Sequence, residues 1–532
     1  MNTAYVVLAV LAVIYVPIWI WVWRKPEQAG RYHLVKYGPA IMIKTRLGMV
    51  VMDRLARFKR FWRGFGFVSK LISAILLVLM VYMMVIAVMA LPERFGSSAI
   101  GIQYALAIPG FNPILPLSYG VIALCVALVI HEMGHGIQTR ANGCKVDSTG
   151  LLYLVVPVGA FVEPNEEEMS KQSRRVQMDM YTAGISVNTF MAVICMVLMV
   201  ASCSVVSSPY DDEIGVYSVA DESPIYYSGI PASALITGIY DSNGDPVEYG
   251  YIPSGTSVVM TFPGDLTSPR PVDPTQTYTI EYEFERESMK AENVQLGAFI
   301  RTITKNSPAS SAGISPGELL YTLTSGSTTY YIASWTDFTT VMSYTSPGDV
   351  VTVTTVTVTD GGAPEVMTYE DIVLSSKGSI GFLGMSVNDS GMTMVTPQTL
   401  LDRAVDPFYG CDTPISYVQG LFSYMSGPFN GMDPISKEVQ WWYDAPGGSF
   451  FWMIVTLLYW IFWIDLLLAI TNALPAVPFD GGFIFAGGVN WFLEKIGIKD
   501  EERRQKMSDG ISKSVSTIAL FMFILVFMAF II

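Results

Sequence analysis

Two histidines and a glutamate, His131, Glu132 and His135, lie inside an apolar segment of membrane length, Leu117–Ala141. Residues four apart share one face of a helix, so both imidazoles can bind one metal ion while Glu132 points at its open position. Zn²⁺ with two histidines and one further protein ligand keeps a fourth position for water and lowers the pKa of that water to about 7. The pattern therefore predicts metal-assisted hydrolysis with Glu132 as the base.

The alternative is that this five-residue pattern arose by chance, as it does in many soluble sequences. The chain has three histidines in all, and two of them are in the pattern. A charged side chain at the bilayer centre costs about 2.5 kcal/mol or more, so such residues usually mark function. We therefore interpret the pattern as a metal site.

The rest of the chain has the composition of a polytopic α-helical membrane protein, with 51% hydrophobic residues. Its net charge of −14 argues against a nucleic-acid partner. The five cysteines have no CxxC spacing, so we expect unpaired thiols. Apolar runs predict about six transmembrane helices. These runs are 3–23, 71–91, 117–139, 178–206, 450–474 and 511–532.

The loop between the first two runs, residues 24–70, carries twelve lysines and arginines against Glu27 and Asp53. By the positive-inside rule this loop is cytosolic. Counting spans from it places both chain termini and residues 207–449 outside the cytosol. The same count places His131 and His135 toward the cytosolic end of their helix.

An apolar segment too short to span, Leu151–Pro164, follows the histidine helix and is rich in Val, Pro and Gly. We expect a strand or a re-entrant loop. Irregular backbone at membrane depth must be buried by protein or line a wet cavity, and either case places the segment near the metal. The alternative is a buried loop with no role in substrate binding.

The extracytosolic region contains a repeat, and its composition indicates a β-rich structure. Residues 223–230, SPIYYSGI, recur as residues 307–314, SPASSAGI. Each phrase is similar to the start of the short helix in bacterial-type PDZ domains, although the first copy lacks the usual Gly-Asp that follows. PDZ domains bind peptide ends by adding a strand; the alternative is a pair of spacers. The aromatic segment 386–448 is expected along the outer membrane surface.

The third metal ligand must be an acid, since His33 lies in the basic loop. Glu163 and Glu166 to Glu168 are near in sequence, but no helix aims them at the site. Asp480 is the better candidate, because the span before it also ends on the cytosolic side, and Pro475, Pro478 and two glycines break the helix there. The alternative is that Asp480 caps a helix end in the cytosol.

With these residues assembled, the chain resembles the site-2 protease family of intramembrane zinc metalloproteases. The resemblance rests on His131-Glu132-x-x-His135 and on the later motif formed by Asn472, Pro475, Asp480 and Gly481. It implies one Zn²⁺ bound by His131, His135 and Asp480, with Glu132 as general acid and base and Asn472 steadying the oxyanion. Asn188 falls where the family has Gly-x-x-x-Asn, and either contacts substrate or joins helices.

The predicted function is endoproteolysis inside a transmembrane helix of a single-span membrane protein, within the lipid bilayer of the cell membrane. The substrate must unwind, and the segment that includes Val158, Gly159, Ala160 and Phe161 can hold it as an added strand. The PDZ-like copies would filter substrates by the size of their outer part. The alternatives are a PDZ-bearing scaffold that does not cleave, and a zinc protease acting on soluble or lipidated ends at the membrane face.

The expected domain organisation follows from these assignments. Six parts are predicted: 1–115 with two helices and the basic loop, 116–206 with the histidine helix and the middle helix, 207–290 and 291–385 as tandem PDZ-like domains, 386–448 as a connecting segment, and 449–532 with the Asp-Gly motif and the last helix.

Overall fold

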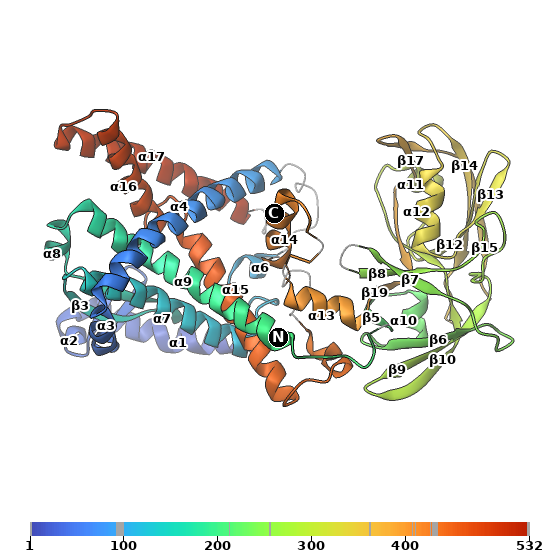
Figure 1. The fold of residues 1–532 in the computed structure, drawn as a ribbon, viewed down its shortest axis with the longest axis horizontal. Helices are drawn as coiled ribbons and strands as arrows, with labels where there is room; N and C mark the ends of the chain where they lie inside the picture. Colours follow the sequence, from blue (N-terminus) through green and yellow to red (C-terminus); the bar gives the residue numbers. More distant parts are fainter. Residues whose placement is uncertain are drawn as a thin grey trace. The chain divides into compact units, whose positions relative to one another are not determined.

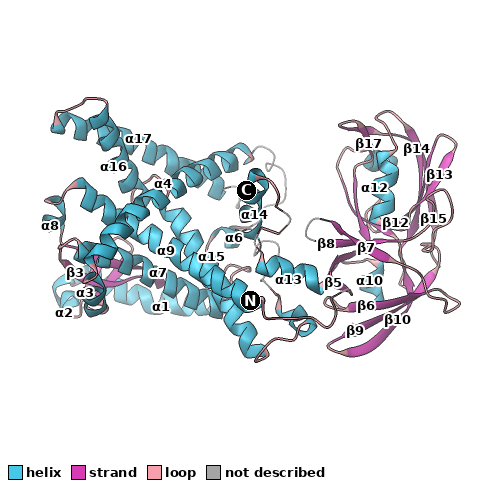
Figure 2. Cartoon of the chain, in the orientation of Figure 1, coloured by secondary structure: helices cyan, strands magenta, loops and turns pink. Residues whose placement is uncertain are grey.

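A computed structural model describes residues 3–528 apart from 92–100, 212, 255–256, 361–362, 407, 410, 426 and 428–434. The chain forms two compact units. The first, largely helical, contains residues 1–199, 425–431 and 453–532, and the second, rich in strands, contains 200–424 and 432–452 (Figure 2). The predicted combination of membrane helices and a β-rich insertion is confirmed.

Five helices of the described chain are long and apolar enough to cross a membrane. They are α4 (Lys59–Met89), α7 (Leu117–Ala141), α9 (Arg174–Cys203), α15 (Ser449–Asn472) and α17 (Glu501–Met528) (Figure 1). The sixth predicted span is covered by α1 (Thr3–Arg24). The side chains at the start of α1 lie outside the described residues, and its apolar segment Ala12–Arg24 is shorter than a span.

Helix α4 begins twelve residues before the predicted span, inside the segment expected to be a cytosolic loop. No proline interrupts residues 59–70, and long cationic side chains keep their charges at a surface while their stems cover apolar area. The remaining helices of this unit are short or surface elements. They are α2 (Pro26–Arg31), α3 (Met49–Ala56), α6 (Ile102–Ala105), α8 (Glu166–Ser170) and α16 (Asp480–Lys495).

An antiparallel sheet of four strands accompanies the helices, in the order β1 (Leu34–Tyr37), β2 (Ala40–Thr45), β3 (Val146–Leu154) and β4 (Val156–Pro164). Residues 151–164 were predicted as one strand or a re-entrant loop, and they form instead the end of β3 and all of β4, which pair as a hairpin. The basic segment was predicted as a loop, and its two strands were missed. Strand β2 pairs with β3, which lies about a hundred residues later in the chain, so no local pattern indicates that pairing.

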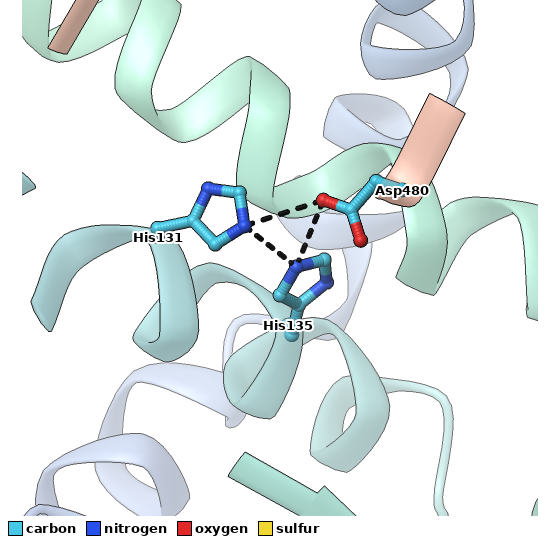
Figure 3. Close-up of side chains that lie close together, drawn as sticks. All are labelled: His131, His135 and Asp480. Atoms are coloured by element: carbon cyan, nitrogen blue, oxygen red, sulfur yellow. Dashed lines mark hydrogen bonds and ion pairs between the residues drawn. The ribbon is translucent and has the colours of Figure 1, made fainter. Parts of the chain in front are cut away.

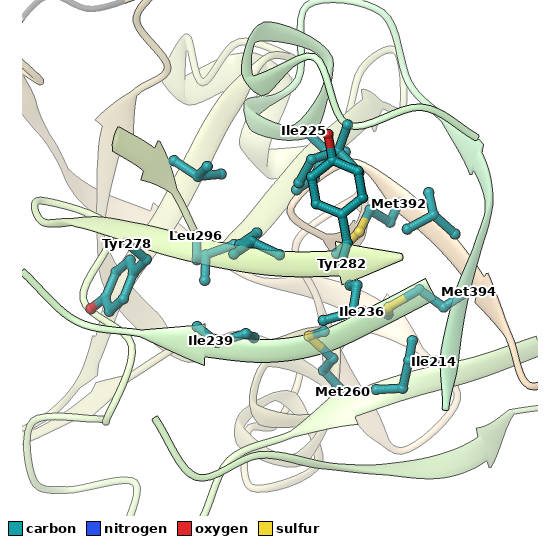
Figure 4. Packing of buried hydrophobic residues seen from close by; sticks show 14 of the residues in the cluster. Ile214, Ile225, Ile236, Ile239, Met260, Tyr278, Tyr282, Leu296, Met392 and Met394 are labelled. Carbon is teal, nitrogen blue, oxygen red and sulfur yellow. The ribbon is translucent and has the colours of Figure 1, made fainter. Parts of the chain in front are cut away.

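The β-rich unit has two apolar cores, and Figure 4 shows Ile236, Met260 and Met394 among the side chains that fill the first. Its strands are β5 (Ile214–Val219), β6 (Leu235–Tyr240), β7 (Gly250–Ser254), β8 (Ser257–Thr261), β9 (Thr277–Phe284), β10 (Glu287–Gln295), β11 (Ala298–Ile303), β12 (Glu318–Ser325), β13 (Thr328–Tyr331), β14 (Val350–Thr357), β15 (Val366–Val373), β16 (Ser375–Lys377), β17 (Ile380–Phe382), β18 (Met385–Asp389) and β19 (Met392–Val395). Its helices are α10 (Pro224–Ser228), α11 (Pro308–Ala312), α12 (Trp335–Ser343), α13 (Pro397–Val405), α14 (Pro414–Met425) and the 3₁₀ helix η2 (Lys437–Trp442).

The two repeated phrases form the same capped turn. In α10 the Ser223 hydroxyl caps the N-terminus and Gly229 ends the helix with φ of 72°. In α11 Ser307 and Gly313 do the same, with φ of 84°. Serine satisfies a free N–H of the first turn, and glycine adopts the left-handed conformation without strain. The sequence repeat is thus a structural repeat.

The order of the two cores along the chain differs from the predicted tandem arrangement. Strand β19 pairs with β5, and its Met392 and Met394 belong to the first core. The second core, built from residues 298–387, is therefore inserted into the first. A return strand of four residues carries too short a pattern to assign to either copy from sequence.

Two aromatic residues of the segment expected along the membrane surface pack inside the protein. Trp442 is fully buried, and its indole N–H donates to the carbonyl of Ser233 at 2.8 Å. The Tyr443 hydroxyl donates to the carbonyl of Pro397 at 2.9 Å. Aromatic side chains suit a protein core as well as a membrane interface, so their presence alone does not place segment 386–448 at the bilayer surface.

Candidate metal centre

The histidines lie one turn apart on α7, as the sequence predicts. Their Nε2 atoms approach to 3.2 Å, and each lies 3.2 Å from Oδ2 of Asp480. Figure 3 shows the two imidazole nitrogens and the carboxylate oxygen facing one another. All three side chains are at least 85% buried. Among the described residues, this is the one group of His, Cys, Asp and Glu side chains placed to hold a metal ion.

Asp480 reaches the histidines because the chain reverses tightly between α15 and α16. A Cβ on Gly481 would overlap the backbone of Ala473 and Leu474, and one on Gly482 would lie 2.6 Å from the backbone of Ala476. Such contacts exclude any side chain. The paired glycines therefore let the first turn of α16, which contains Asp480, fold back against the end of α15.

The spacing of the three donor atoms fits zinc. A tetrahedral Zn²⁺ with bonds of about 2.0–2.1 Å separates its ligand atoms by about 3.3 Å, close to the three edges of 3.2 Å. The second ring nitrogen of His135, Nδ1, lies 2.8 Å from the carbonyl of Met180. A carbonyl only accepts, so Nδ1 carries the proton and the lone pair of Nε2 points toward the other two donors.

Helix α9 closes one side of the centre through a glycine. A Cβ on Gly184 would overlap Nε2 of His135 and would lie 2.7 Å from Cε1 of His131. Asn188, one turn further along α9, is fully buried, and its amide has no hydrogen-bond partner among the described residues. Gly184 is thus required by close packing against the imidazoles, which the Gly-x-x-x-Asn spacing alone did not reveal.

Glu132 stands beside the three donors and bonds to a strand. Its Oε2 accepts the N–H of Val162 in β4 at 2.9 Å. Strand β4 is the edge of the sheet, and its N–H at Val162 points away from β3. Backbone groups alternate in direction along a strand, so those of Ala160 face the same free edge. The edge next to the candidate base therefore carries backbone groups that no strand of the described sheet pairs with.

The other residues predicted to bind substrate lie in strand β4, and not all of their side chains are described. The ring of Phe161 lies against Gly150 of β3, where an added Cβ would be 2.6 Å from its Cζ. Gly159 pairs with Leu152. The side chain of Val158 lies outside the described residues. These positions form the strand, and the structure brings Val162, which the prediction did not single out, closest to Glu132.

Three of the four alternative acids for the third ligand pair with cations elsewhere, and the side chain of the fourth, Glu166, lies outside the described residues. Glu163 accepts from Lys44 at 2.6 Å, a bond that lowers the pKa of its carboxyl. Glu167 and Glu168 pair with Lys171 and Lys145. The Asn472 amide donates to the carbonyl of Leu468 in its own helix at 3.1 Å, and its role toward the oxyanion stays a prediction.

Two comparisons with known proteins bear on this site. The model of peptidase family M50 matches residues 119–512, a range that contains both histidines, Glu132 and Asp480. An uncharacterized protein of Methanocaldococcus jannaschii is 31% identical over 170 residues, which are 31% of this chain and 43% of that protein. The chain thus spans less than half the length of this relative.

Proposed function

We propose that this chain, which belongs to peptidase family M50, the site-2 protease family, is a zinc endopeptidase that cleaves transmembrane segments of other proteins. The observation that carries the proposal is the triangle of His131, His135 and Asp480, with Glu132 beside it. Three of these residues, His131, Glu132 and His135, lie on a helix long and apolar enough to cross a membrane. We infer from this position that the peptide to be hydrolysed is itself in the bilayer.

The chain's own groups support the chemistry of peptide hydrolysis. A zinc ion held by the three donors would supply the Lewis acid that activates water and polarises the scissile carbonyl. Glu132 takes a proton from the attacking water and passes it to the leaving amine. The Val162 N–H holds one carboxylate oxygen of Glu132, which leaves the other free to accept that proton.

The edge strand β4 is the proposed substrate platform. A substrate helix hides its carbonyl groups in internal hydrogen bonds and must become extended before attack. An extended segment can pair with the free backbone groups of β4 at Ala160, and this pairing brings it to Glu132. Asn188 is a candidate to bind a freed substrate carbonyl, since its buried amide has no other partner in the described chain.

The proposal also includes the side of the membrane on which the site lies and the role of the β-rich unit. We infer from loop charge that the site lies toward the cytosol and the β-rich unit outside. The capped repeats support a pair of related β domains, which we propose act as a size filter on substrates. A single-span protein with a small outer part would pass.

Two other functions compete with this one. In a scaffold that does not cleave, the metal would be structural, but a structural site has no use for the base Glu132. A protease acting on lipidated or soluble ends at the membrane face would need no span in its substrate. Both are tested by the experiment that follows.

The test is cleavage of purified single-span proteins by the purified chain, with and without a zinc chelator. We expect cleavage within the span, loss of cleavage with chelator and recovery on adding zinc. A peptide that represents only the soluble part of each substrate serves as the control. Cleavage of the soluble peptide alone would favour the membrane-face protease, and binding without any cleavage would favour the scaffold.

A further inference from the structure

Helix α4 lies before the region matched by the family model, which begins at residue 119. It nevertheless packs against both α7 and α9, the helices that surround the imidazoles. Its Lys70 makes an ion pair with Asp179 of α9, whose side chain is 4% exposed. The carbonyl of the next residue, Met180, is the group that orients the His135 imidazole. The pair therefore joins α4 to α9 one residue from the group that holds His135.

We propose that Lys70 and Asp179 are positioning residues that hold the Met180 carbonyl, and through it His135, in the metal-binding orientation. The inference rests on the proposed zinc site. It assigns a role to a helix outside the matched region, and to an ion pair that takes no part in the chemistry.

The contact between α4 and α9 is close and continuous. A Cβ on Gly66 of α4 would lie 2.7 Å from the Asp179 carboxyl. Further along, the Ser186 hydroxyl donates to the carbonyl of Ser69 at 3.2 Å, and the Ser73 hydroxyl donates to the carbonyl of Thr182 at 3.4 Å. Small residues let two membrane helices approach closely enough for such bonds.

One face of α9 contacts α4, and another face contacts the imidazoles. Asp179, Thr182 and Ser186 are spaced three and four residues apart, so they share the face that meets α4. Met180 and Gly184 are four apart and share the face that meets the imidazoles. Because the helix is rigid, fixing the first face fixes the rotation of the second.

Helix α4 also holds the histidine helix itself. The Gln138 amide of α7, three residues after His135, donates to the carbonyl of Trp62 at 3.1 Å. It lies beside the Lys70–Asp179 pair, since its Nε2 would be 2.9 Å from a Cβ on Gly66. Helix α4 is therefore bonded to both helices whose relative position sets the hydrogen bond between His135 Nδ1 and Met180.

The test is the zinc dissociation constant of the purified full chain, measured by competition with a chromophoric chelator. Groups that orient a ligating histidine typically contribute about 10–100-fold to metal affinity, so we expect Lys70→Met to weaken zinc binding by a factor in this range. The matched control is Lys44→Met, which breaks a half-exposed ion pair with Glu163 that touches neither His135 nor Met180. Zinc affinity should be unchanged in the control.

A double variant separates positioning from a general loss of stability. Lys70→Met alone leaves the buried carboxylate of Asp179 unpaired, whereas Lys70→Met with Asp179→Asn removes both charges. We expect the double variant to regain thermal stability without zinc, while its zinc affinity stays low. This variant also decides the matter if the single variant does not fold.

The outcomes are distinct. Wild-type zinc affinity in a folded Lys70→Met or double variant would overturn the positioning role and leave the proposed function intact. Zinc affinity that returns together with stability in the double variant would also overturn it. A wild-type chain that binds no zinc would instead refute the proposed function.

Discussion

Each unit buries charged groups, but the two units satisfy them differently. In the β-rich unit, Arg270 and Asp337 form two contacts, of 3.0 and 3.3 Å. Arg270 also donates to the carbonyls of Phe262 and Pro263, and Asp337 accepts the N–H of Ala333. In the helical unit, two imidazole nitrogens and a carboxylate oxygen of the metal centre instead face one another.

This difference indicates that the Arg270–Asp337 pair stabilises the fold, whereas the histidine–aspartate group binds a metal ion. A buried ion pair that is fully hydrogen-bonded needs nothing further, and loss of either partner destabilises the protein. Two imidazole nitrogens and a carboxylate oxygen gathered at 3.2 Å are the donor set of a metal ion, and they can share one cation between them. The comparison therefore predicts opposite consequences for mutations in the two clusters.

The largest expected effect is at the metal centre. Asp480→Ala removes one of three donors, so we expect loss of bound zinc and of all cleavage, with the helical unit still folded. His135→Ala should behave in the same way. Elemental analysis of purified variants, together with their cleavage rates, measures this. Full zinc content and turnover in Asp480→Ala would show that the third ligand is a different residue.

The corresponding change in the β-rich unit should lower the stability of that unit and leave the amount of bound zinc unchanged. Asp337→Ala leaves Arg270 buried and uncompensated, which costs about 3–5 kcal/mol of unfolding free energy. Zinc content should stay at the wild-type level in the folded protein. Thermal or denaturant unfolding of the β-rich unit, monitored by limited proteolysis, measures the predicted loss of stability. If the Asp337 variant were as stable as the wild type, the two clusters would not differ as argued.

A smaller effect is expected from Asp389, which links α12 and β8 by accepting the N–H groups of Trp335 and Met260. Burial raises its pKa from 3.8 to about 6, against the lowering effect of these two bonds. The folded unit then binds more protons than the unfolded one between these values. Its contribution is full below the unfolded pKa of 3.8 and is lost as the pH rises through about 6.

We therefore expect the β-rich unit to be less stable at neutral pH than in mild acid by about 1–3 kcal/mol from this group. Asp389→Asn should flatten this part of the pH dependence, because the amide does not titrate. Unfolding curves of both proteins at several pH values provide the measurement. An unchanged slope in the variant would assign the dependence to other groups.

The smallest expected effect is the change in substrate cleavage when the β-rich cores are deleted. Deleting residues 214–395 removes both cores, including the return strand β19, and leaves every residue of the metal centre in place. If the β-rich unit is a filter, zinc binding persists and cleavage of a substrate with a large outer domain rises. A substrate with a minimal outer part is the control. No gain for the large substrate would refute the filter.

The metal centre was predictable because its signals are local. His131 and His135 are four residues apart, and loop charge predicts that the span before Asp480 ends at the same depth, so helix periodicity and loop charge sufficed to group the three residues. Gly184 and Val162 were not assigned roles, because their importance comes from close contacts with α7 that only the fold reveals.

The fold was predictable to a similar extent and for a similar reason. Membrane-length helices are recognisable from composition, and five are present in the described chain. Strands β1 and β2 belong to a sheet completed by distant strands, and the return strand β19 also pairs with a distant partner. A tryptophan such as Trp442 is equally suited to a membrane surface and to a protein core. Its burial results from packing within the β-rich unit.

The most direct test of the central claim is Glu132→Gln, which keeps the size of the side chain and removes its ability to take a proton. Position 132 supplies no ligand in the proposed site, so the variant should bind zinc as the wild type does. We expect no measurable cleavage of a single-span substrate that the wild type cuts. Wild-type turnover by a zinc-loaded Glu132→Gln variant would contradict the assignment of Glu132 as the base.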